Sequence, residues 1–209
     1  WLRLGADGWR LDVADELPDD FIRGIHNAAR ETGSDATVLG EVWEDGTTKI
    51  AYGVRRKHLL GNHLDGLMNY PFRTALLAFL SGGTGAAFRE AMEILREHYP
   101  PFAFHNAMNF LGTHDTPRIL TLLGVGGDGR DRDRSWRREH RLSGEELERG
   151  LALLRLGLLV LFGFPGAPTL YYGDEAGLEG FEDPWNRRTY PWGRENQALL
   201  DFCRLLGGL

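Results

Sequence analysis

Cysteine is almost absent from this chain of 209 residues, in which Cys203 is the only one. A single cysteine cannot form a disulfide within the chain, so nothing in the sequence indicates an oxidising compartment. Cys203 stands among apolar residues, and an isolated thiol in such a setting is typical of a plain core position. The sequence leaves the localisation open and, among the compartments, favours the cytoplasm.

Long apolar runs and a surplus of basic charge are also missing. The one extended apolar stretch, residues 151–164, contains Arg155 and is too short to span a bilayer. The 24 basic residues are outnumbered by 30 acidic ones, and most of them alternate with acids. A nucleic-acid partner needs a coherent basic face. We therefore expect neither a membrane nor a nucleic acid as partner.

Signatures of nucleotide and metal sites are absent as well. No Gly-x-Gly-x-x-Gly follows a predicted strand, and there is no Walker A motif, so the sequence does not predict a nucleotide site. No His or Cys cluster has the spacing of metal ligands. We accordingly expect no cofactor and no metal ligand in this chain.

Short apolar segments alternate with helix-like segments along the whole chain. We predict strands at residues 8–13, 37–42, 64–68, 108–112 and 169–172. We predict helices at about 18–31, 71–80, 84–98, 117–123, 143–162 and 195–206. Residues 124–142 are expected to form a polar loop, and 173–192 a long loop rich in aromatic and charged residues. This alternation predicts a parallel α/β sheet, closed as a barrel or, as the alternative, open and doubly wound.

Three acidic residues stand at the ends of predicted strands. Asp12 follows Gly-Trp-Arg-Leu, Glu41 follows Val-Leu-Gly, and Asp115 follows Phe-Leu-Gly-Thr-His. Active-site carboxylates at the carboxyl ends of parallel strands are typical of a barrel enzyme. Cleavage of a glycosidic bond requires two carboxyl groups flanking it. The pattern therefore favours a glycosidase.

These segments, in this order, resemble the α-amylase family, glycoside hydrolase family 13. Residues 8–14, 40–43 and 109–115 are similar to the family segments on barrel strands four, five and seven. Met-Asn-Tyr-Pro-Phe at 68–72 resembles the strand-six region of neopullulanases, cyclomaltodextrinases and maltogenic amylases, and residues 165–175 resemble the strand-eight region. The resemblance is closest to that branch and covers nearly the whole chain.

The resemblance implies a partial (β/α)8 TIM barrel, about strands four to eight, with the first three strands missing. Residues 1–209 would be one partial catalytic domain without a complete second domain. The chain starts with Trp1 rather than Met, and we expect an upstream portion to be missing. An isolated chain of this extent is expected to be unstable or inactive.

The resemblance also assigns roles to the three acids. Asp12 would be the nucleophile, Glu41 the acid/base, and Asp115 the carboxylate that binds sugar hydroxyls and stabilises the oxocarbenium-like transition state. Arg10 would pair with Asp12, and a purely structural salt bridge is the other interpretation. His114 would hydrogen-bond the sugar.

Further residues are candidates for contact with the substrate. Trp43, Tyr70 and Arg118 complete the predicted substrate-binding set. Candidates for stacking on sugar rings, although each taken alone is more typical of core or loop packing, are Trp43, Tyr70, Phe72, Trp185 and Trp192. Residues near the last strand that could support or shape the site are Asp174, Glu175, Asp183, Asn186, Arg187 and Arg188.

The predicted activity is retaining hydrolysis of α-1,4-glucosidic bonds in α-glucans, maltooligosaccharides or cyclodextrins, by double displacement through a covalent glycosyl-enzyme. The alternatives are an α-glucosidase or transglycosylase of the same family, and a sugar-binding homologue without catalysis. An α-glucan oligosaccharide is the expected partner. The resemblance leaves open a homodimeric parent and a structural calcium ion in the parent, although this sequence supplies no complete set of calcium ligands.

Overall fold

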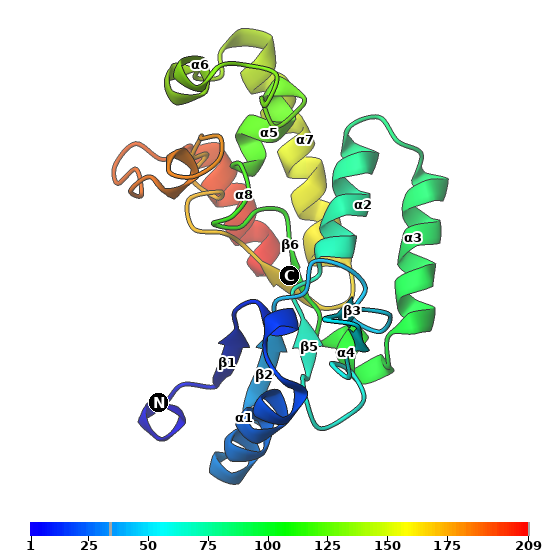
Figure 1. Cartoon of the computed structure of the whole chain (residues 1–209). Helices are drawn as coiled ribbons and strands as arrows, with labels where there is room; N and C mark the ends of the chain where they lie inside the picture. Colours follow the sequence, from blue (N-terminus) through cyan, green and yellow to red (C-terminus); the bar gives the residue numbers. More distant parts are fainter. Residues whose placement is uncertain (34, 209) are drawn as a thin grey trace. The chain divides into compact units, whose positions relative to one another are not determined.

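Strands and helices alternate along the computed structural model of the chain, which describes residues 1–33 and 35–208 (Figure 1). The backbone divides into two compact units. The first comprises Trp1–Ala75, Gly85–Asn109 and Pro165–Ala167, and the second comprises Leu76–Thr84, Phe110–Phe164 and Pro168–Leu209. Each unit carries part of the candidate site.

Three parallel strands form the sheet of the first unit. Strand β1 (Gly8–Leu11) pairs with β2 (Thr37–Gly40), which pairs with β5 (Gly66–Leu67). A parallel bridge between Met68 and Met108 continues this order to the start of β6 (Met108–Phe110). The strands predicted at these four places are confirmed in position, although each ends earlier than expected.

Helix α1 (Asp19–Thr32) lies alongside β1 and β2, as Figure 1 shows. Its apolar spacing predicts one buried face, and Ile22 and Ala29 are buried there. Asp19 and Asp20 occupy the first turn, where acidic side chains favour the positive end of the helix dipole. The connection from β1 to β2 is therefore a strand–helix–strand unit, as predicted.

Two helices follow β5, and a short third one was not predicted. Helices α2 (Tyr70–Leu80) and α3 (Gly85–His98) agree with the prediction to within one residue. Pro100 and Pro101 follow α3 and begin α4 (Pro101–His105), with Pro101 in its first turn. Proline suits this position because its missing N–H would have no helical partner.

A small hairpin that the sequence did not predict lies between β2 and β5. Strands β3 (Ile50–Ala51) and β4 (Val54–Arg55) are antiparallel. Their two-residue turn has φ values of 52° at Tyr52 and 75° at Gly53. Tight hairpin turns require positive φ, and Tyr-Gly is not among the usual sequences for such turns.

Three helices form the main part of the second unit. Helix α7 (Gly144–Gly163) packs against α5 (Ile119–Val125) and α8 (Gln197–Gly207). A Cβ atom on Gly150 would lie 3.0 Å from the Cα of Gly124, so two glycines allow α5 and α7 to approach closely. Helices were predicted at all three places.

Residues 124–142 are not entirely a loop, contrary to the prediction. They contain α6 (Arg134–Glu139), whose N-terminus is capped by Asp133, which accepts a 2.8 Å hydrogen bond from the Trp136 N–H. Trp136 stacks on His140 at 4.1 Å and contacts the ring of buried Phe181 at 5.3 Å, and Phe181 supplies the apolar anchor that the Arg-rich sequence concealed.

The start of α7 and the last strand also differ from the prediction. Ser143 precedes α7 without a side-chain capping bond, and Glu146 in the first turn pairs with His140 at 3.0 Å. Strand β7 covers Ala167–Thr169 and pairs with β6. It starts two residues earlier than expected.

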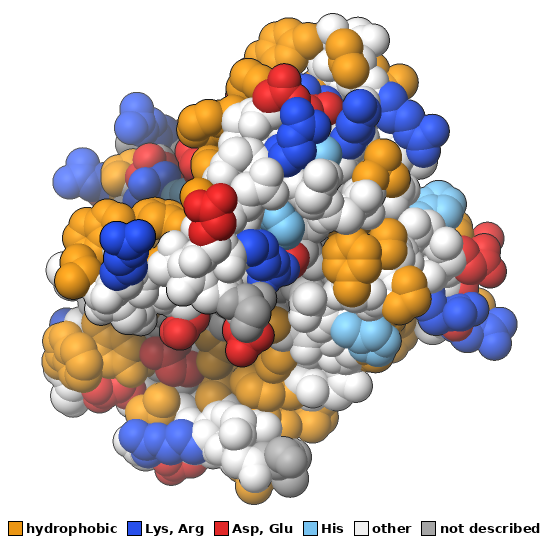
Figure 2. Space-filling model, turned by 90° about the horizontal axis from the view of Figure 1, so that it is seen from below, with side chains coloured by type: hydrophobic (Ala, Val, Ile, Leu, Met, Phe, Trp, Pro, Cys, Tyr) orange, Lys and Arg blue, Asp and Glu red, His pale blue; other side chains and the backbone are white. Residues whose placement is uncertain are grey.

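Within the described residues, no helix is long and apolar enough to cross a membrane. Figure 2 shows basic and acidic side chains intermixed over the face in view. This agrees with the alternation of charges along the sequence.

Candidate functional site

Two candidate carboxylates lie directly after neighbouring strands of the first unit. Asp12 follows β1 and Glu41 follows β2. The Glu41 N–H donates to the Leu11 carbonyl at 3.0 Å, and the Ala14 N–H donates to the Glu41 carbonyl at 3.1 Å. The strand pairing thus continues past the last strand residues and fixes the backbone of both acids.

Arg10 connects the two carboxylates. It stands two residues before Asp12, so both side chains share one face of the extended chain. One guanidinium nitrogen hydrogen-bonds Asp12, and another lies 3.0 Å from Oε2 of Glu41. The Nε of Arg10 donates to the sulfur of Met68 at 3.3 Å. Met68 was not predicted to support the site, because its role depends on a contact between distant segments.

Glu41 is buried, and several donors surround it. Its side chain is 4% exposed, whereas that of Asp12 is 71% exposed. Oε1 lies 3.2 Å from Nε1 of Trp43 and 3.4 Å from the hydroxyl of Tyr70. The Trp43 and Tyr70 rings stack with centroids 4.3 Å apart. These two predicted substrate-binding residues therefore lie against the candidate acid/base.

A strained residue separates Asp12 from the next helical turn. Val13 has a φ of 40°, a left-handed conformation that β-branched residues rarely adopt. In this conformation its N–H donates to Oε2 of Glu41 at 2.9 Å. Strain of this kind persists only where the surrounding structure holds it in place, and it is frequent at active sites.

The third candidate carboxylate, Asp115, belongs to the second unit. It lies in the loop after β6, and its side chain is 33% exposed. Nε2 of His114 lies 3.2 Å from one carboxylate oxygen, and Arg187 lies 3.4 Å from the other. Asp115 thus sits between two groups that can carry positive charge.

The loop of residues 184–188 supports the backbone on both sides of Asp115. The buried side chain of Asn186 donates to the carbonyls of His114 at 2.7 Å and Thr116 at 2.9 Å. Nε of Arg187 donates to the same His114 carbonyl at 3.2 Å. The sequence placed Asn186 and Arg187 on a long loop but gave no signal that they reach the segment of Asp115.

Arg118 is fully buried and contacts protein groups. Its guanidinium pairs with Asp174 at 3.1 Å and lies 4.1 Å above the Tyr171 ring. Burial raises the pKa of Tyr171 to about 12, although the nearby guanidinium opposes this. These contacts hold residues 171–174 beside the start of α5, and the predicted contact of Arg118 with substrate stays a prediction.

The structure groups the predicted residues by unit. The first unit brings together Arg10, Asp12, Glu41, Trp43 and Tyr70, and the second brings together His114 and Asp115. The meeting of all three carboxylates in one site remains part of the proposal below.

The stacking candidates outside these groups differ in exposure. Phe72 is completely buried and packs edge-on against Phe88, so the interpretation as a sugar-stacking residue is wrong and the core interpretation holds. Trp192 is 80% exposed and contacts the Tyr190 ring. Trp185 lies on the loop that carries Asn186, and the guanidinium of Arg134 lies over its ring.

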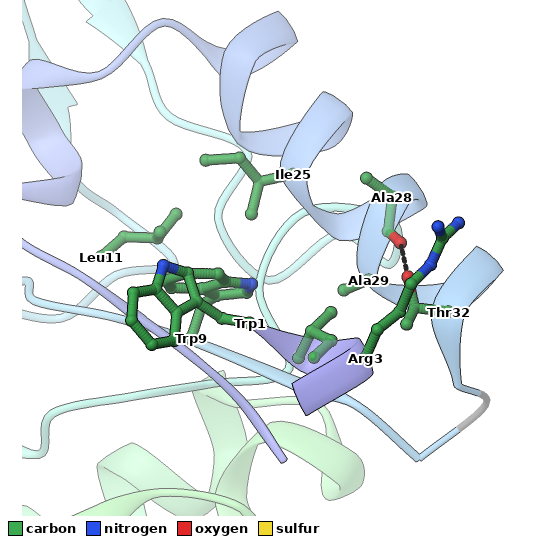
Figure 3. A pocket seen from close by; sticks show the side chains of 9 residues that line it. Trp1, Arg3, Trp9, Leu11, Ile25, Ala28, Ala29 and Thr32 are labelled. Carbon is green, nitrogen blue, oxygen red and sulfur yellow. Dashed lines mark hydrogen bonds between the residues drawn. The ribbon is translucent and has the colours of Figure 1, made fainter. Parts of the chain in front are cut away.

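An apolar cavity of about 480 Å³ in the first unit is separate from the candidate carboxylates (Figure 3). It lies between β1 and α1, with Trp9 and Leu11 on one side and Ile25 and Ala28 on the other. It contains no carboxylate that could carry out the predicted chemistry. Across the described residues, no group of His, Cys, Asp and Glu is arranged to hold a metal ion.

Residues 1–199 match the model of the alpha-amylase catalytic domain. The chain belongs to the alpha-amylase family. The resemblance predicted from the sequence is thereby confirmed, and the family's fold is the (β/α)8 barrel of which the first unit contains consecutive parallel strands.

Alpha-amylase family members with established names are similar over nearly all of this chain. The amylopullulanase of Thermoanaerobacterium saccharolyticum is 36% identical over 97% of this chain and 15% of its own length. Neopullulanase 2 of Thermoactinomyces vulgaris is 33% identical over 99% of this chain and 30% of its own length. The chain therefore spans less than a third of these relatives.

Solved structures agree with this assignment. The ligand-free cyclic alpha-maltosyl-(1→6)-maltose hydrolase from Arthrobacter globiformis matches with a TM-score of 0.80 and 29% identity. The match covers the whole of this chain and 41% of that one.

Proposed function

We propose that the natural protein containing this chain is a retaining glycoside hydrolase that cleaves α-1,4-glucosidic bonds in α-glucans, maltooligosaccharides or cyclodextrins. Family membership and the names of the relatives support the class of enzyme. The observation that carries the mechanism is the pair of carboxylates after β1 and β2 that share the guanidinium of Arg10.

In the first step, the carboxylate of Asp12 attacks the anomeric carbon, and the bond from that carbon to the leaving oxygen breaks. Glu41 gives its proton to the leaving oxygen, so the departing sugar leaves as an alcohol. The exposed position of Asp12 suits a nucleophile that must reach substrate, and the buried position of Glu41 suits a group that exchanges one proton.

In the second step, Glu41 takes a proton from water, and the water oxygen attacks the anomeric carbon while Asp12 leaves. Two displacements at one carbon retain its configuration. An acceptor sugar hydroxyl in place of water would give transglycosylation, which is the alternative outcome of the same steps.

Asp115 is proposed to complete the site by binding sugar hydroxyls and stabilising the positive charge that develops on the sugar ring. Its neighbours His114 and Arg187 orient the carboxylate. Trp43, stacked on Tyr70 and half exposed, is proposed to offer a ring face to a sugar. We further propose that residues 1–209 belong to one catalytic barrel domain, of which they would form about strands four to eight.

The test is sugar release from β-cyclodextrin, pullulan and starch by the natural gene product that contains this chain, expressed with its complete coding sequence. We expect release from at least one glucan and a loss of roughly 10⁴-fold or more in kcat for Asp12→Asn. The conservative Asp128→Asn change, at a carboxylate that pairs with the exposed Arg130, serves as the control and should leave kcat unchanged.

Folded protein that releases no sugar from any of the three glucans would reject the proposal in favour of a binding homologue. Full activity in Asp12→Asn would reject the assignment of the nucleophile while leaving the class of enzyme intact.

A further inference from the structure

We propose that His58 and Lys49 are positioning residues for the pair Asp12 and Glu41, because they hold the strained turn that follows Asp12. This inference rests on the proposed function for its effect on catalysis. The contacts themselves lie entirely within the first unit.

The turn of residues 13–17 sets the geometry of both carboxylates. Val13 follows Asp12 directly, and its strained backbone aims its N–H at Oε2 of Glu41. The next residue, Ala14, donates its N–H to the Glu41 carbonyl. A shift of this turn would therefore displace the nucleophile and remove a hydrogen bond from the acid/base in one movement.

The side chain of Asp15 anchors the turn through both of its oxygens. Oδ1 lies 3.0 Å from Nε2 of His58, and Oδ2 lies 3.1 Å from Nζ of Lys49. Lys49 also pairs with Glu44. The carboxylates of Glu44 and Asp15 raise the pKa of Lys49 against the effect of burial, so its ammonium group stays charged at neutral pH.

Further contacts join the same two segments. The hydroxyl of Tyr52 hydrogen-bonds Glu16, and Arg56 donates to the Leu17 carbonyl. Arg56 also pairs with Asp19 at 3.2 Å. We call residues 49–58 the clasp, since each of these side chains reaches from them to residues 15–19. The clasp contains the β3–β4 hairpin and follows Glu41 along the chain.

His58 is the most enclosed member of the clasp. Its side chain has no exposed surface, and its Nδ1 has no hydrogen-bond partner among residues 1–33 and 35–208. The imidazole therefore contributes one polar contact, to Asp15, besides its packing. A glutamine amide can donate the same hydrogen bond, which makes Gln the conservative replacement.

Loss of the clasp should allow Val13 to relax toward an ordinary backbone conformation. The expected effect is on kcat, because the reacting carboxylates move, and less on KM, because Trp43 and Tyr70 support each other by stacking. Displacement of a reacting group by about 1 Å can lower the rate by roughly 10²-fold.

The experiment compares His58→Ala, His58→Gln and Lys49→Met in the complete natural protein, with β-cyclodextrin and starch as substrates. We expect kcat to fall about 10- to 100-fold in His58→Ala, with KM within about threefold, and to recover most of its value in His58→Gln. The matched control is His98→Ala. His98 pairs with Asp45 at 2.5 Å in the same unit, but Asp45 lies outside the turn of residues 13–17.

Hydrogen exchange at the amides of Val13 and Ala14 gives a readout that does not depend on activity. Faster exchange in His58→Ala but not in His98→Ala supports the clasp, even if the wild-type protein releases no sugar and the proposed function fails. Unchanged kcat in an active protein, or unchanged exchange in an inactive one, overturns it. If His58→Ala does not fold, the same comparison is made with Lys49→Met.

Discussion

The two groups of candidate residues hold their carboxylates in different ways. In the first unit, buried Glu41 and exposed Asp12 share one guanidinium and are connected through the backbone of adjacent strands. In the second unit, Asp115 lies on a loop and is held by His114, by Arg187 and, through the backbone, by Asn186. Groups that exchange atoms or protons with substrate need tighter positioning than a group that stabilises charge.

Contacts of the sheet hold the first group, and contacts of loops hold the second. Arg10, Asp12 and Glu41 depend on strand register, which a single strand pair determines. Asp115 depends on a contact between residues separated by about 70 positions in sequence. The first arrangement should tolerate changes in the loop of residues 184–188, and the second should not.

The largest difference is expected when the cation of each group is removed. Arg10→Met leaves buried Glu41 and the adjacent Asp12 without their shared cation, and we expect kcat to fall roughly 10²- to 10³-fold. Arg187→Met removes a partly exposed ion pair, whose loss should cost less than about tenfold in kcat.

Kinetics of both variants on the same glucan check this ordering. A larger loss in Arg187→Met than in Arg10→Met would contradict it and would make the loop-held carboxylate the more demanding group.

A smaller effect is expected from removal of the Asn186 amide. Asn186→Ala removes the side-chain donor of the Thr116 carbonyl and leaves the His114 carbonyl with Arg187. An unpaired buried polar group costs about 1–3 kcal/mol of the free energy of unfolding. Activity should fall as well, since the loop of Asp115 loses its support. Urea denaturation and kinetics measure the two effects.

Asn196→Ala is the matched control for this substitution. Asn196 caps α8 by accepting a 3.1 Å hydrogen bond from the Leu199 N–H, and its loss should cost about 1 kcal/mol of stability. Its activity should remain that of the wild type. Equal losses of activity in both variants would show that Asn186 acts through general stability alone.

The smallest effect is expected from a change of pH, which acts on the free energy of unfolding. Burial lowers the pKa of His58 below its usual value of 6.5, against the opposing effect of Asp15, and burial also lowers the pKa of His63. The folded state thus binds fewer protons than the unfolded state just below pH 6.5. The contribution of these two histidines to the free energy of unfolding is complete above this pH. It is lost as the pH falls toward their pKa values in the folded state.

Urea midpoints between pH 7.5 and about 5 test this sign. His58→Gln should lose less stability on acidification than the wild type, and the double variant with His63→Gln should lose less still. An unchanged slope in the double variant would exclude these two histidines as the source.

Much of the fold could be predicted from the sequence, because its elements depend on local patterns. The apolar spacing of α1 and the apolar core of β2 identify these elements without knowledge of their partners. Helix α6 was missed because its anchor, the contact of Trp136 with Phe181, joins residues about 45 positions apart in the sequence. The β3–β4 hairpin was missed because Tyr52 is an unusual residue for a turn with positive φ.

In the candidate site, too, features set by local patterns could be predicted and those set by distant contacts could not. Strand-end positions identified Asp12 and Glu41, and the contact of both with Arg10 follows from the alternation of side chains along β1. The roles of Met68, Asn186 and the clasp could not be predicted, since each joins segments that are distant in sequence. The catalytic roles of the three acids stay predictions until they are measured.

The most direct test of the central claim is to trap the covalent intermediate. Glu41→Gln protein would be mixed with α-maltosyl fluoride, whose fluoride leaves without a proton from Glu41, and the intact protein and its peptides would be weighed by mass spectrometry. Without Glu41 to activate water, a maltosyl adduct should accumulate on the peptide that contains Asp12 and should be absent when Asp12→Asn is added. An adduct on another carboxylate, or inversion of configuration in the wild-type product, would contradict the proposed mechanism.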